Sequence, residues 1–252
     1  MSKQLYGNII VNQFVLDFLG KKVLSSGPFD YYIYQTIENE TISLNELRSF
    51  TIYIFDKQSE TKIKVNEINY FLEQGDCLQA ENCAVDLTTF GGTATLLIAG
   101  TTQPHPSLEG LFLTKYADIY KVEKPWGYEL WINGQHPCYA LKKISIKAGT
   151  KTSLQYHNFK QETNVLFQGL ANLHYKKNIL VENDCVSASD ISTILLKPIS
   201  AMDVVPKTLH RVEAITDIVT FETSTPHLDD VIRVQDDSKR PDGRLIEEHI
   251  NT

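Results

Sequence analysis

The segment from Gly149 to Gly169, GTKTSLQYHNFKQETNVLFQG, constrains the fold of this chain more than any other stretch. Gln155 and His157 lie two residues apart, so on a strand their side chains point to the same face. Glu162 follows five residues later, which leaves room for a turn before the apolar run Val165–Phe167. The spacing therefore predicts a hairpin that brings the Glu162 carboxylate back opposite the Gln155–His157 pair.

A second histidine lies far downstream, where His210 closes the run VVPKTLH after a proline turn. With Gln155, His157 and Glu162 it makes a set of two imidazoles, one carboxylate and one amide oxygen. A mixed nitrogen and oxygen set of this kind suits a divalent transition ion. We therefore expect these four residues to bind a metal, with Gln155 as a weaker ligand than an imidazole.

The spacing of these residues resembles the first motif of the cupin family, with a glycine at each end and Gln155 where most cupins have histidine. In type II phosphomannose isomerases this motif has the sequence SLQ-x-H, as it does here. Those enzymes also have a PWG segment, matched by Lys124-Pro125-Trp126-Gly127, and an HR pair, matched by His210-Arg211. Their ending resembles LDDVIR at 228–233. The resemblance covers about half the chain, from Val122 to Arg240, and the first half shows no such match.

The chain also departs from the family pattern. Asn158, Phe159 and Thr163 stand where the family has further histidines. The second motif lacks the usual glycine, and its interval Pro206–His210 is one residue shorter than the family's. Both changes leave the four expected ligands in place, so they bear on the identity of the substrate.

Short stretches rich in β-branched and aromatic residues recur along the whole chain, as at Tyr31–Tyr34 and Phe50–Phe55. Many short strands separated by turn residues are typical of an all-β sandwich or barrel. Tyr139–Lys147 alternates and is expected to place Lys142 and Ile144 on one face, and Val165–His174 is expected to form one strand. The resemblance implies a cupin barrel, the double-stranded β-helix or jelly roll.

A weak internal echo links EQGD at 73–76 with KPIS at 197–200, near half the chain length. It favours a bicupin whose N-terminal half is degenerate, because no histidine precedes His105. Two unrelated β segments are the alternative. The expected division is 1–104 for the degenerate domain, 105–240 for the metal-binding barrel and 241–252 for a surface tail with a short helix.

Composition excludes several classes of protein. With 24 basic and 31 acidic residues, the net charge of −7 argues against binding to a nucleic-acid backbone. No apolar run approaches a membrane span, and the N-terminus lacks the pattern of a secretion signal, so a cytoplasmic protein is expected. The four cysteines show no CxxC spacing and indicate neither a disulfide scaffold nor a metal cluster: Cys77, Cys83, Cys138 and Cys185.

Basic residues around the expected barrel mouth have two readings. Lys124, Lys142, Arg211 and Arg233 either pair with surface carboxylates or hold a phosphate group, as the resemblance implies. Arg211 directly follows His210, so on a strand it points away from the metal. Lys142 and Arg233 are the better candidates for the reaction. Glu222 is expected to be a general base or to pair with a lysine, so the expected catalytic residues are Lys142, Glu222 and Arg233.

The resemblance implies a metal-dependent isomerase that interconverts mannose 6-phosphate and fructose 6-phosphate. The alternatives are a non-catalytic sugar-binding or sensory cupin, and a cupin epimerase or oxygenase that acts on a related small molecule. The expected cofactor is a divalent metal ion, with zinc before manganese, nickel, cobalt or iron. The expected ligand is a sugar phosphate or nucleotide sugar, with neither nucleic acid nor membrane as a partner. A homodimer is expected because cupins often pair through sheet edges.

Overall fold

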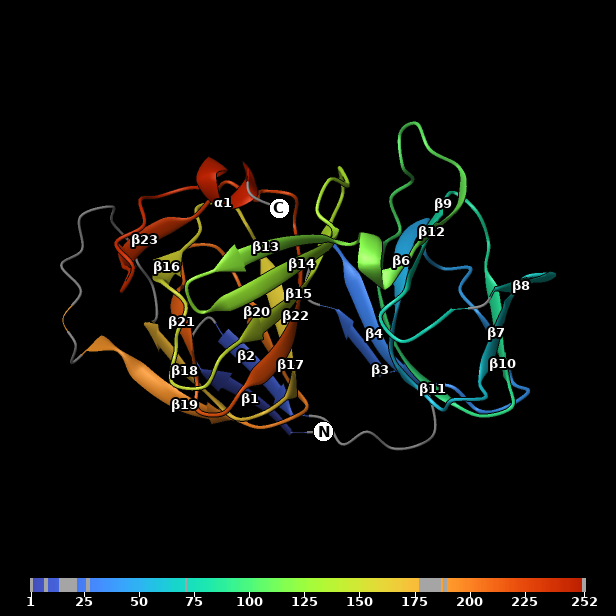
Figure 1. Ribbon diagram of the computed structural model, residues 1–252. Coiled ribbons are helices and arrows are strands. Elements are labelled where there is room, and N and C mark those ends of the chain that lie inside the picture. Colours follow the sequence, from blue (N-terminus) through green and yellow to red (C-terminus); the bar gives the residue numbers. More distant parts are fainter. Residues whose placement is uncertain are drawn as a thin grey trace. The chain divides into compact units, whose positions relative to one another are not determined.

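The computed structural model describes residues 2–6, 9–13, 22–25, 28–70, 72–176, 187 and 190–250 of the 252-residue chain. The chain forms two compact units, coloured along the sequence in Figure 1. Unit 1 consists of Met1–Leu16, Tyr120–Gly134 and Ala140–Thr252, and unit 2 consists of Asp17–Ile119 and Gln135–Tyr139. These units differ from the expected ranges because strand pairing, rather than order along the chain, assigns each segment.

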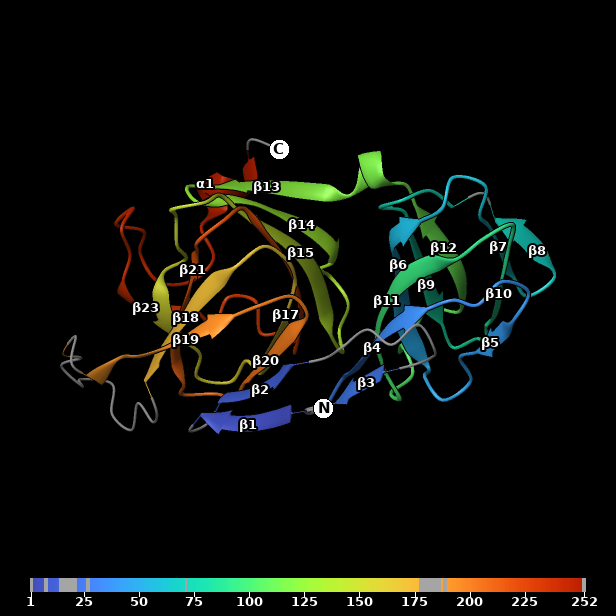
Figure 2. The same cartoon turned by 90° about the horizontal axis from the view of Figure 1, so that it is seen from below.

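Unit 1 contains two antiparallel sheets (Figures 1 and 2). The larger sheet has the spatial order β1 (Ser2–Tyr6), β2 (Ile9–Gln13), β20 (Ser200–Val204), β17 (Glu162–Gln168), β22 (Ile218–Ser224), β15 (Ala140–Ile146), β14 (Gly127–Asn133) and β13 (Tyr120–Lys124). The smaller sheet has the order β19 (Ser192–Leu196), β18 (Ala171–Lys176), β21 (Leu209–Ala214), β16 (Leu154–Tyr156) and β23 (Ile232–Gln235). The chain ends in the short helix α1 (Ile246–Ile250).

Apolar side chains from both sheets of unit 1 pack into one core. Leu166, Met202 and Ile218 come from the larger sheet, and Leu173 and Tyr175 come from the smaller one. Inward and outward residues alternate along β18, whose burial changes at every residue. The two sheets therefore form a sandwich. The apolar side chains just named fill one part of its interior, and polar side chains line the rest.

Unit 2 repeats the arrangement of two antiparallel sheets with a different set of strands. Its larger sheet has the order β12 (Gly110–Thr114), β9 (Cys77–Glu81), β6 (Ser49–Lys57), β11 (Ala94–Thr101), β4 (Asp30–Gln35) and β3 (Lys22–Ser25). Its smaller sheet has the order β5 (Thr41–Ser43), β10 (Asp86–Phe90), β7 (Lys62–Val65) and β8 (Ile68–Tyr70). The 3-10 helix η1 (Tyr116–Asp118) follows β12.

Two local expectations about the central motif are wrong. The stretch 165–174 is two strands, β17 and β18, because the chain turns at Gly169 with a φ of +82°. A Cβ at Gly169 would lie 2.2 Å from the carbonyl oxygen of Asp217, so only glycine fits this turn. The expected hairpin is also absent, because β16 and β17 belong to different sheets. Residues 157–161 instead carry the chain from one sheet to the other.

The fold class expected from the sequence, an all-β chain with many short strands, is confirmed. Among the described residues, no helix combines the length and the apolar character needed to cross a membrane. Cys77, Cys83 and Cys138 take part in no disulfide within the described part of the chain, and Cys185 lies outside it.

Candidate metal centre and its cavity

Three of the four expected metal ligands converge inside unit 1. His157 follows β16, Glu162 opens β17 and His210 lies near the start of β21. Their ligand atoms all lie within 4.8 Å of one another, and all three side chains are buried. His210 Nε2 is 3.0 Å from Glu162 Oε1, and His157 Nε2 is 3.4 Å from Glu162 Oε2. The two sheets thus meet at one carboxylate flanked by two imidazoles.

The second nitrogen of each histidine fixes which nitrogen faces the carboxylate. His210 Nδ1 donates to the Thr208 carbonyl oxygen at 3.0 Å, and His157 Nδ1 donates to the carbonyl oxygen of Asp230. A carbonyl oxygen cannot donate, so both Nδ1 atoms carry a proton and a neutral ring turns its Nε2 lone pair toward Glu162. Lone pairs that face a carboxylate repel it unless a proton or a cation lies between them.

These donors fit a divalent metal ion. His157 Nε2 is buried and has no hydrogen-bond partner among the described residues. Burial raises the pKa of Glu162, but Lys160 and His157 outweigh this effect and hold that pKa well below its usual value. The Glu162 carboxylate is therefore ionised, as a metal ligand must be. One cation would satisfy the carboxylate and both imidazoles together.

Asp230 shapes the corner between the two sheets. Its carboxylate accepts hydrogen bonds from the backbone N–H groups of Asn158, Phe159 and Lys160 at 2.9, 2.5 and 2.9 Å. Burial raises the pKa of Asp230, and the three N–H groups lower it to below its usual value. The same residue holds His157 through its carbonyl oxygen, so one residue fixes both the turn and the orientation of a candidate ligand.

Gln155, the fourth expected ligand, lies on the correct face of the sheet. On β16 it is directly opposite His210 of β21 and Arg233 of β23, and directly opposed residues share a face. Gln155 also lines the cavity of unit 1. Its Oε1, however, accepts a hydrogen bond from Ser153 Oγ at 2.5 Å. Its part in metal binding stays a prediction.

A row of inward side chains crosses the larger sheet beside the three ligands. The register pairs Trp131 with Lys142, Lys142 with Glu222 and Glu222 with Asn164. Lys142 Nζ lies 4.2 Å from the centre of the Trp131 ring and 3.9 Å from Glu222 Oε1. The predicted catalytic residues Lys142 and Glu222 are thus cross-strand neighbours that face the same cavity, and their role in a reaction stays a prediction.

Lys160 joins this row to the candidate ligands, and the sequence analysis did not single it out. Its Nζ is 2.5 Å from Glu162 Oε2 and 2.7 Å from Glu222 Oε1, and its side chain is 5% exposed. Burial lowers the pKa of Lys160, but the two carboxylates raise it to above its usual value. A protonated lysine therefore sits between two buried carboxylates, one of which is a candidate metal ligand.

Glu129 extends the alternation of charge to the far side of the cavity. Its Oε2 accepts a hydrogen bond from the Trp131 indole at 2.8 Å and lies 3.7 Å from Lys142 Nζ. Burial raises the pKa of Glu129, but Lys142 and Lys124 bring it down to about 2. The cavity wall therefore reads carboxylate, ammonium, carboxylate, ammonium, carboxylate from Glu129 to Glu162.

These groups line a cavity of about 110 Å³ in unit 1. At about 10–15 Å³ for each water, this is room for roughly seven to eleven water molecules. The C-terminal segment lines it too, through Arg240, Gly243, Arg244, Leu245, Glu248 and His249. In the described part of the tail expected at 241–252, ion pairs and ring contacts of Glu248 and His249 hold the segment against the barrel, while Ile246 and Glu247 are exposed. The expected helix at 245–250 is confirmed as α1.

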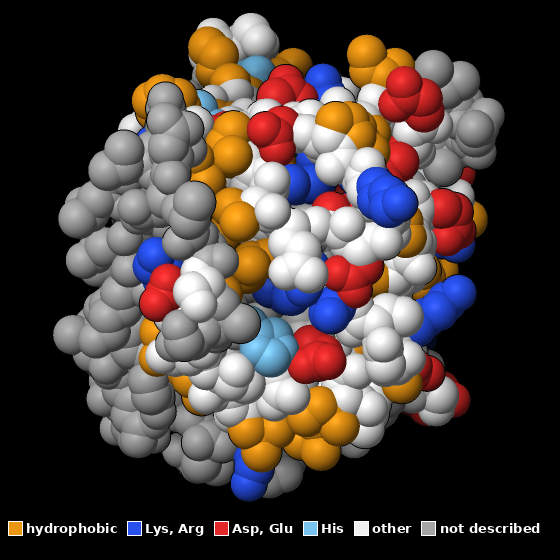
Figure 3. All heavy atoms as spheres, turned by 90° about the vertical axis from the view of Figure 1, so that its left-hand side faces the viewer, with side chains coloured by type: hydrophobic (Ala, Val, Ile, Leu, Met, Phe, Trp, Pro, Cys, Tyr) orange, Lys and Arg blue, Asp and Glu red, His pale blue; other side chains and the backbone are white. Residues whose placement is uncertain are grey.

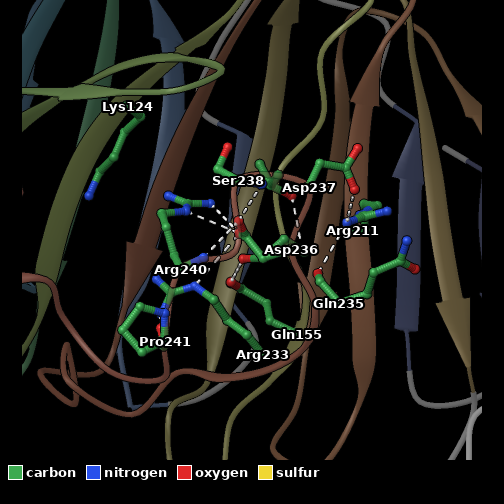
Figure 4. Close-up of polar contacts among 12 residues, drawn as sticks. Lys124, Gln155, Arg211, Arg233, Gln235, Asp236, Asp237, Ser238, Arg240 and Pro241 are labelled. Carbon is green, nitrogen blue, oxygen red and sulfur yellow. Dashed lines mark hydrogen bonds and ion pairs between the residues drawn. The ribbon is translucent and has the colours of Figure 1, made fainter.

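Arg233, the third predicted catalytic residue, lines the cavity, but its guanidinium group binds backbone carbonyl oxygens. Its Nη1 donates to the carbonyl oxygens of Gly243, at 2.8 Å, and Pro241. Burial lowers the pKa of Arg233, and the nearby Arg240 lowers it further. In Figure 4, Arg233 lies beside Gln155 and Arg240, and the dashed contacts converge on Asp236. A role for Arg233 in catalysis stays a prediction.

Arg211 points away from the metal centre, as its place next to His210 indicates. Its Nη2 donates to the Gln235 carbonyl oxygen at 3.1 Å and lies 3.3 Å from Asp237 Oδ1. It lines a second hollow, together with His174 and Glu213. Figure 3 shows basic, acidic and histidine side chains gathered on this side of unit 1. The position separates Arg211 from the cavity chemistry.

A signal for the missed residues was present in the sequence. Glu162 and Asn164 are two apart on β17, as are Glu129 and Trp131 on β14, so each pair shares a face. A polar residue at an inward position of an alternating strand is unusual, because burial of a polar group is costly without a partner. Lys160 had no such signal, since it lies in the corner between the sheets.

The family comparison matches the second part of the chain. Residues 114–236, which are 123 of 252, match the family model described as "Mannose-6-phosphate isomerase C-terminal". The matched range contains the three converging ligands and the Lys142–Glu222 pair. No curated protein sequence matches the chain. The resemblance to this cupin family, read from the motif residues, is confirmed.

Solved structures match the fold at low sequence identity. Protein Ylba from E. coli, of family DUF861, is 11% identical with a TM-score of 0.63, over 87% of this chain and 90% of that one. Oxalate decarboxylase from Bacillus subtilis is 10% identical with a TM-score of 0.59, over 88% and 73%. Salicylate 1,2-dioxygenase from Pseudaminobacter salicylatoxidans is 11% identical with a TM-score of 0.57, over 81% and 76%. These matches show the cupin fold and extend beyond one unit.

Proposed function

From a cupin fold whose residues 114–236 match the mannose-6-phosphate isomerase C-terminal family, we propose that unit 1 is a metal-dependent aldose–ketose isomerase of sugar phosphates. The observation that carries the proposal is the direct contact between the metal centre and a paired acid and base. Lys160 bridges Glu162, a candidate ligand, and Glu222, a candidate base, at 2.5 and 2.7 Å. Isomerisation needs both the metal centre and the base, since the metal binds the two reacting oxygens of the sugar and the base moves a proton between its carbons.

His157, Glu162 and His210 would hold the ion, with Gln155 as a further oxygen donor on the same face. A divalent ion bound there supplies Lewis acidity to adjacent carbonyl and hydroxyl oxygens of the sugar. Zinc is the first expectation, because the set combines two imidazoles with a carboxylate, and manganese, nickel, cobalt and iron are the alternatives.

The side chains of the row across the larger sheet perform the proton transfers in this proposal. Glu222 takes the proton from one carbon of the sugar and returns it to the neighbouring carbon. Lys142, held over Trp131 and 3.9 Å from Glu222, donates a proton to the carbonyl oxygen that becomes a hydroxyl and takes back the proton of the neighbouring hydroxyl, which becomes the carbonyl. Lys160 positions both carboxylates, since its ammonium contacts each of them. The buried surroundings strengthen these interactions by excluding water.

The test is elemental analysis of the purified protein together with an assay that interconverts mannose 6-phosphate and fructose 6-phosphate with added divalent metals. We expect stoichiometric metal and turnover, and Glu222→Gln should lower kcat by about 10²–10⁴-fold while the metal content stays unchanged. Metal with no turnover on any sugar phosphate would favour the sugar-binding alternative. Oxygen consumption with iron would favour the oxygenase. Size-exclusion chromatography with light scattering tests the expected homodimer.

A further inference from the structure

The C-terminal segment covers one side of the cavity, and the Glu248 carboxylate makes the ion pairs that attach its tip. Glu248 of α1 places Oε2 2.6 Å from Lys124 Nζ and Oε1 3.4 Å from Arg240 Nη1. All three side chains line the cavity, and the exposed fraction is 14% for Glu248, 9% for Lys124 and 10% for Arg240. Each oxygen of this carboxylate thus contacts one cation, as two oxygens of a bound phosphoryl group would.

The two cations stay beside the cavity without Glu248. Arg240 is held by Asp236, whose Oδ2 accepts hydrogen bonds from Arg240 Nε at 3.0 Å and from Nη2 at 2.7 Å (Figure 4). Lys124 is the last residue of β13, so the sheet fixes its backbone beside the cavity. Loss of Glu248 would therefore leave an arranged Arg240 with the Lys124 ammonium within reach of the same cavity.

The root and the tip of the C-terminal segment are attached differently. At the root, the Gly243 N–H donates to the Val231 carbonyl oxygen at 2.8 Å, and Arg233 binds the backbone of Pro241 and Gly243. At the tip, α1 is held by the Glu248 ion pairs, by the edge-on contact of His249 with Trp131, and by the Tyr120 hydroxyl, which contacts the carbonyl oxygen and Nδ1 of His249 at 3.0 Å. The tip can therefore separate from the barrel while the root stays bound.

A second observation also points to an anion at this end of the cavity. Arg233 Nε is buried and has no hydrogen-bond partner among the described residues, its nearest carboxylate oxygen being Asp236 Oδ2 at 3.9 Å. Besides Lys142 and Lys160, which pair with the carboxylates of the cavity wall, Lys124, Arg240 and Arg244 also line the cavity. Buried guanidinium groups with unused donors are suited to the oxygens of a phosphate or carboxylate.

We propose that Lys124 and Arg240 form the subsite for the phosphoryl group of the substrate, and that Glu248 fills this subsite until the substrate displaces it and releases α1. The sugar phosphate as substrate rests on the proposed function, whereas the anion subsite rests on the contacts of Glu248.

The first test is calorimetric titration of the metal-loaded protein with inorganic phosphate. Glu248→Gln keeps the shape of the side chain and removes the competing charge, so it should bind phosphate about tenfold more tightly than the wild type. Glu247→Gln is the matched control, because Glu247 is an exposed neighbour on the same helix. Equal affinities of the two variants would overturn the proposal.

The second test locates the bound phosphate. Lys124→Gln should weaken phosphate binding about tenfold or more, whereas Lys121→Gln, on the same strand and 47% exposed, should leave it unchanged. If phosphate binds Lys124→Gln as tightly as the wild type, the anion sits elsewhere, for example on the metal, and the subsite is wrong. This comparison does not depend on the folding of a truncated chain.

The third test follows the release of α1 by tryptophan fluorescence. His249 packs edge-on against Trp131 with ring centres 4.9 Å apart, and Trp126 and Trp131 are the two tryptophans of the chain. Phosphate should shift the emission of the wild type, and ligand-free Glu248→Gln should already show the shifted emission. An unchanged emission in both cases would contradict the release of α1.

The outcomes separate this inference from the proposed function. Tighter phosphate binding by Glu248→Gln with no turnover of any sugar phosphate would support the subsite and reject the isomerase. Turnover with no difference between Glu248→Gln and Glu247→Gln would reject the subsite and leave the isomerase standing.

Discussion

Units 1 and 2 share paired antiparallel sheets but use the interior in different ways. The core of unit 2 consists of apolar residues such as Ile52, Ile54 and Leu78, all with 0% exposure. At inward positions of unit 1 the chain instead places Lys142 and Glu222. Buried charges are costly unless they pair with one another or with a ligand. Unit 2 therefore uses its interior for stability, whereas unit 1 uses some interior positions for the charged residues of the candidate site.

Unit 2 contains one buried ionisable pair of its own. Glu81 of β9 and His136 of the segment Gln135–Tyr139 lie 3.1 Å apart, with side chains 0% and 1% exposed. Gln79 donates a further hydrogen bond to Glu81 at 2.6 Å. This pair fastens a segment that is remote in sequence into unit 2, which is a structural task. The comparison shows that a buried charge pair alone does not mark a reactive site.

The largest expected effect is the loss of the metal ligands of unit 1. His157→Ala and His210→Ala should each remove the metal and lower isomerase activity by at least about 10³-fold, because the proposed chemistry needs the ion. Metal content by elemental analysis and kcat/KM are the measurements. His174→Ala is the control, since His174 pairs with Glu213 at 2.8 Å away from the metal centre. Full activity in both ligand variants would reject the metal-dependent mechanism.

The next effect concerns the lysine that joins the two carboxylates. Lys160→Met should lower kcat by about 10²-fold and destabilise the fold by about 3–5 kcal/mol, because Glu162 and Glu222 lose their shared cation. The double variant Lys160→Met/Glu222→Gln should regain part of the stability and none of the activity. Lys151→Met, whose side chain is 34% exposed, is the control. A thermal unfolding series and a KM-against-kcat comparison measure both effects.

The contrast between the interiors predicts different costs for the same truncation. Ile52→Ala in unit 2 should lower the free energy of unfolding by about 4 kcal/mol, because it leaves a void in a fully packed core. Ile144→Ala in unit 1 should cost about 2 kcal/mol, since Ile144 already lines the cavity and is 8% exposed. Denaturant titrations of both variants provide the comparison. Equal costs would mean that the cavity of unit 1 is packed as tightly as the core of unit 2.

The smallest effect is a pH dependence of unit 2. Burial raises the pKa of Glu81, but hydrogen bonds from His136 and Gln79 outweigh this effect and lower it to below its usual value. A depressed pKa contributes stability above the unfolded value of about 4.3, and this contribution is lost as the pH falls through the folded value. Stability should therefore decrease below about pH 4.

Denaturant midpoints between pH 3 and pH 6 measure this dependence. Glu81→Gln should be less stable than the wild type at pH 6 and should show a flatter dependence on pH. Glu67→Gln is the control, because the Glu67 side chain is 96% exposed. A slope in Glu81→Gln equal to that of the wild type would assign the acid sensitivity to other groups.

The sequence predicted the all-β class and the residues of the candidate metal centre. The spacing of the motif and the family resemblance singled out His157, Glu162 and His210, and their side chains converge in the structure. The inward face of β15, with Lys142 and Ile144, also followed from alternation. These features are local, so a single sequence carries them.

Only the tertiary structure decided how these residues meet. The sequence predicted a hairpin, whereas β16 and β17 belong to different sheets and Glu162 reaches His210 across the sandwich. It also gave no sign that Lys160 lies between two carboxylates or that Glu248 reaches Lys124, 124 residues away along the chain. Such pairs depend on which sheet edges and loops come together. That choice results from the packing of the whole unit, because no local pattern encodes a contact between distant segments.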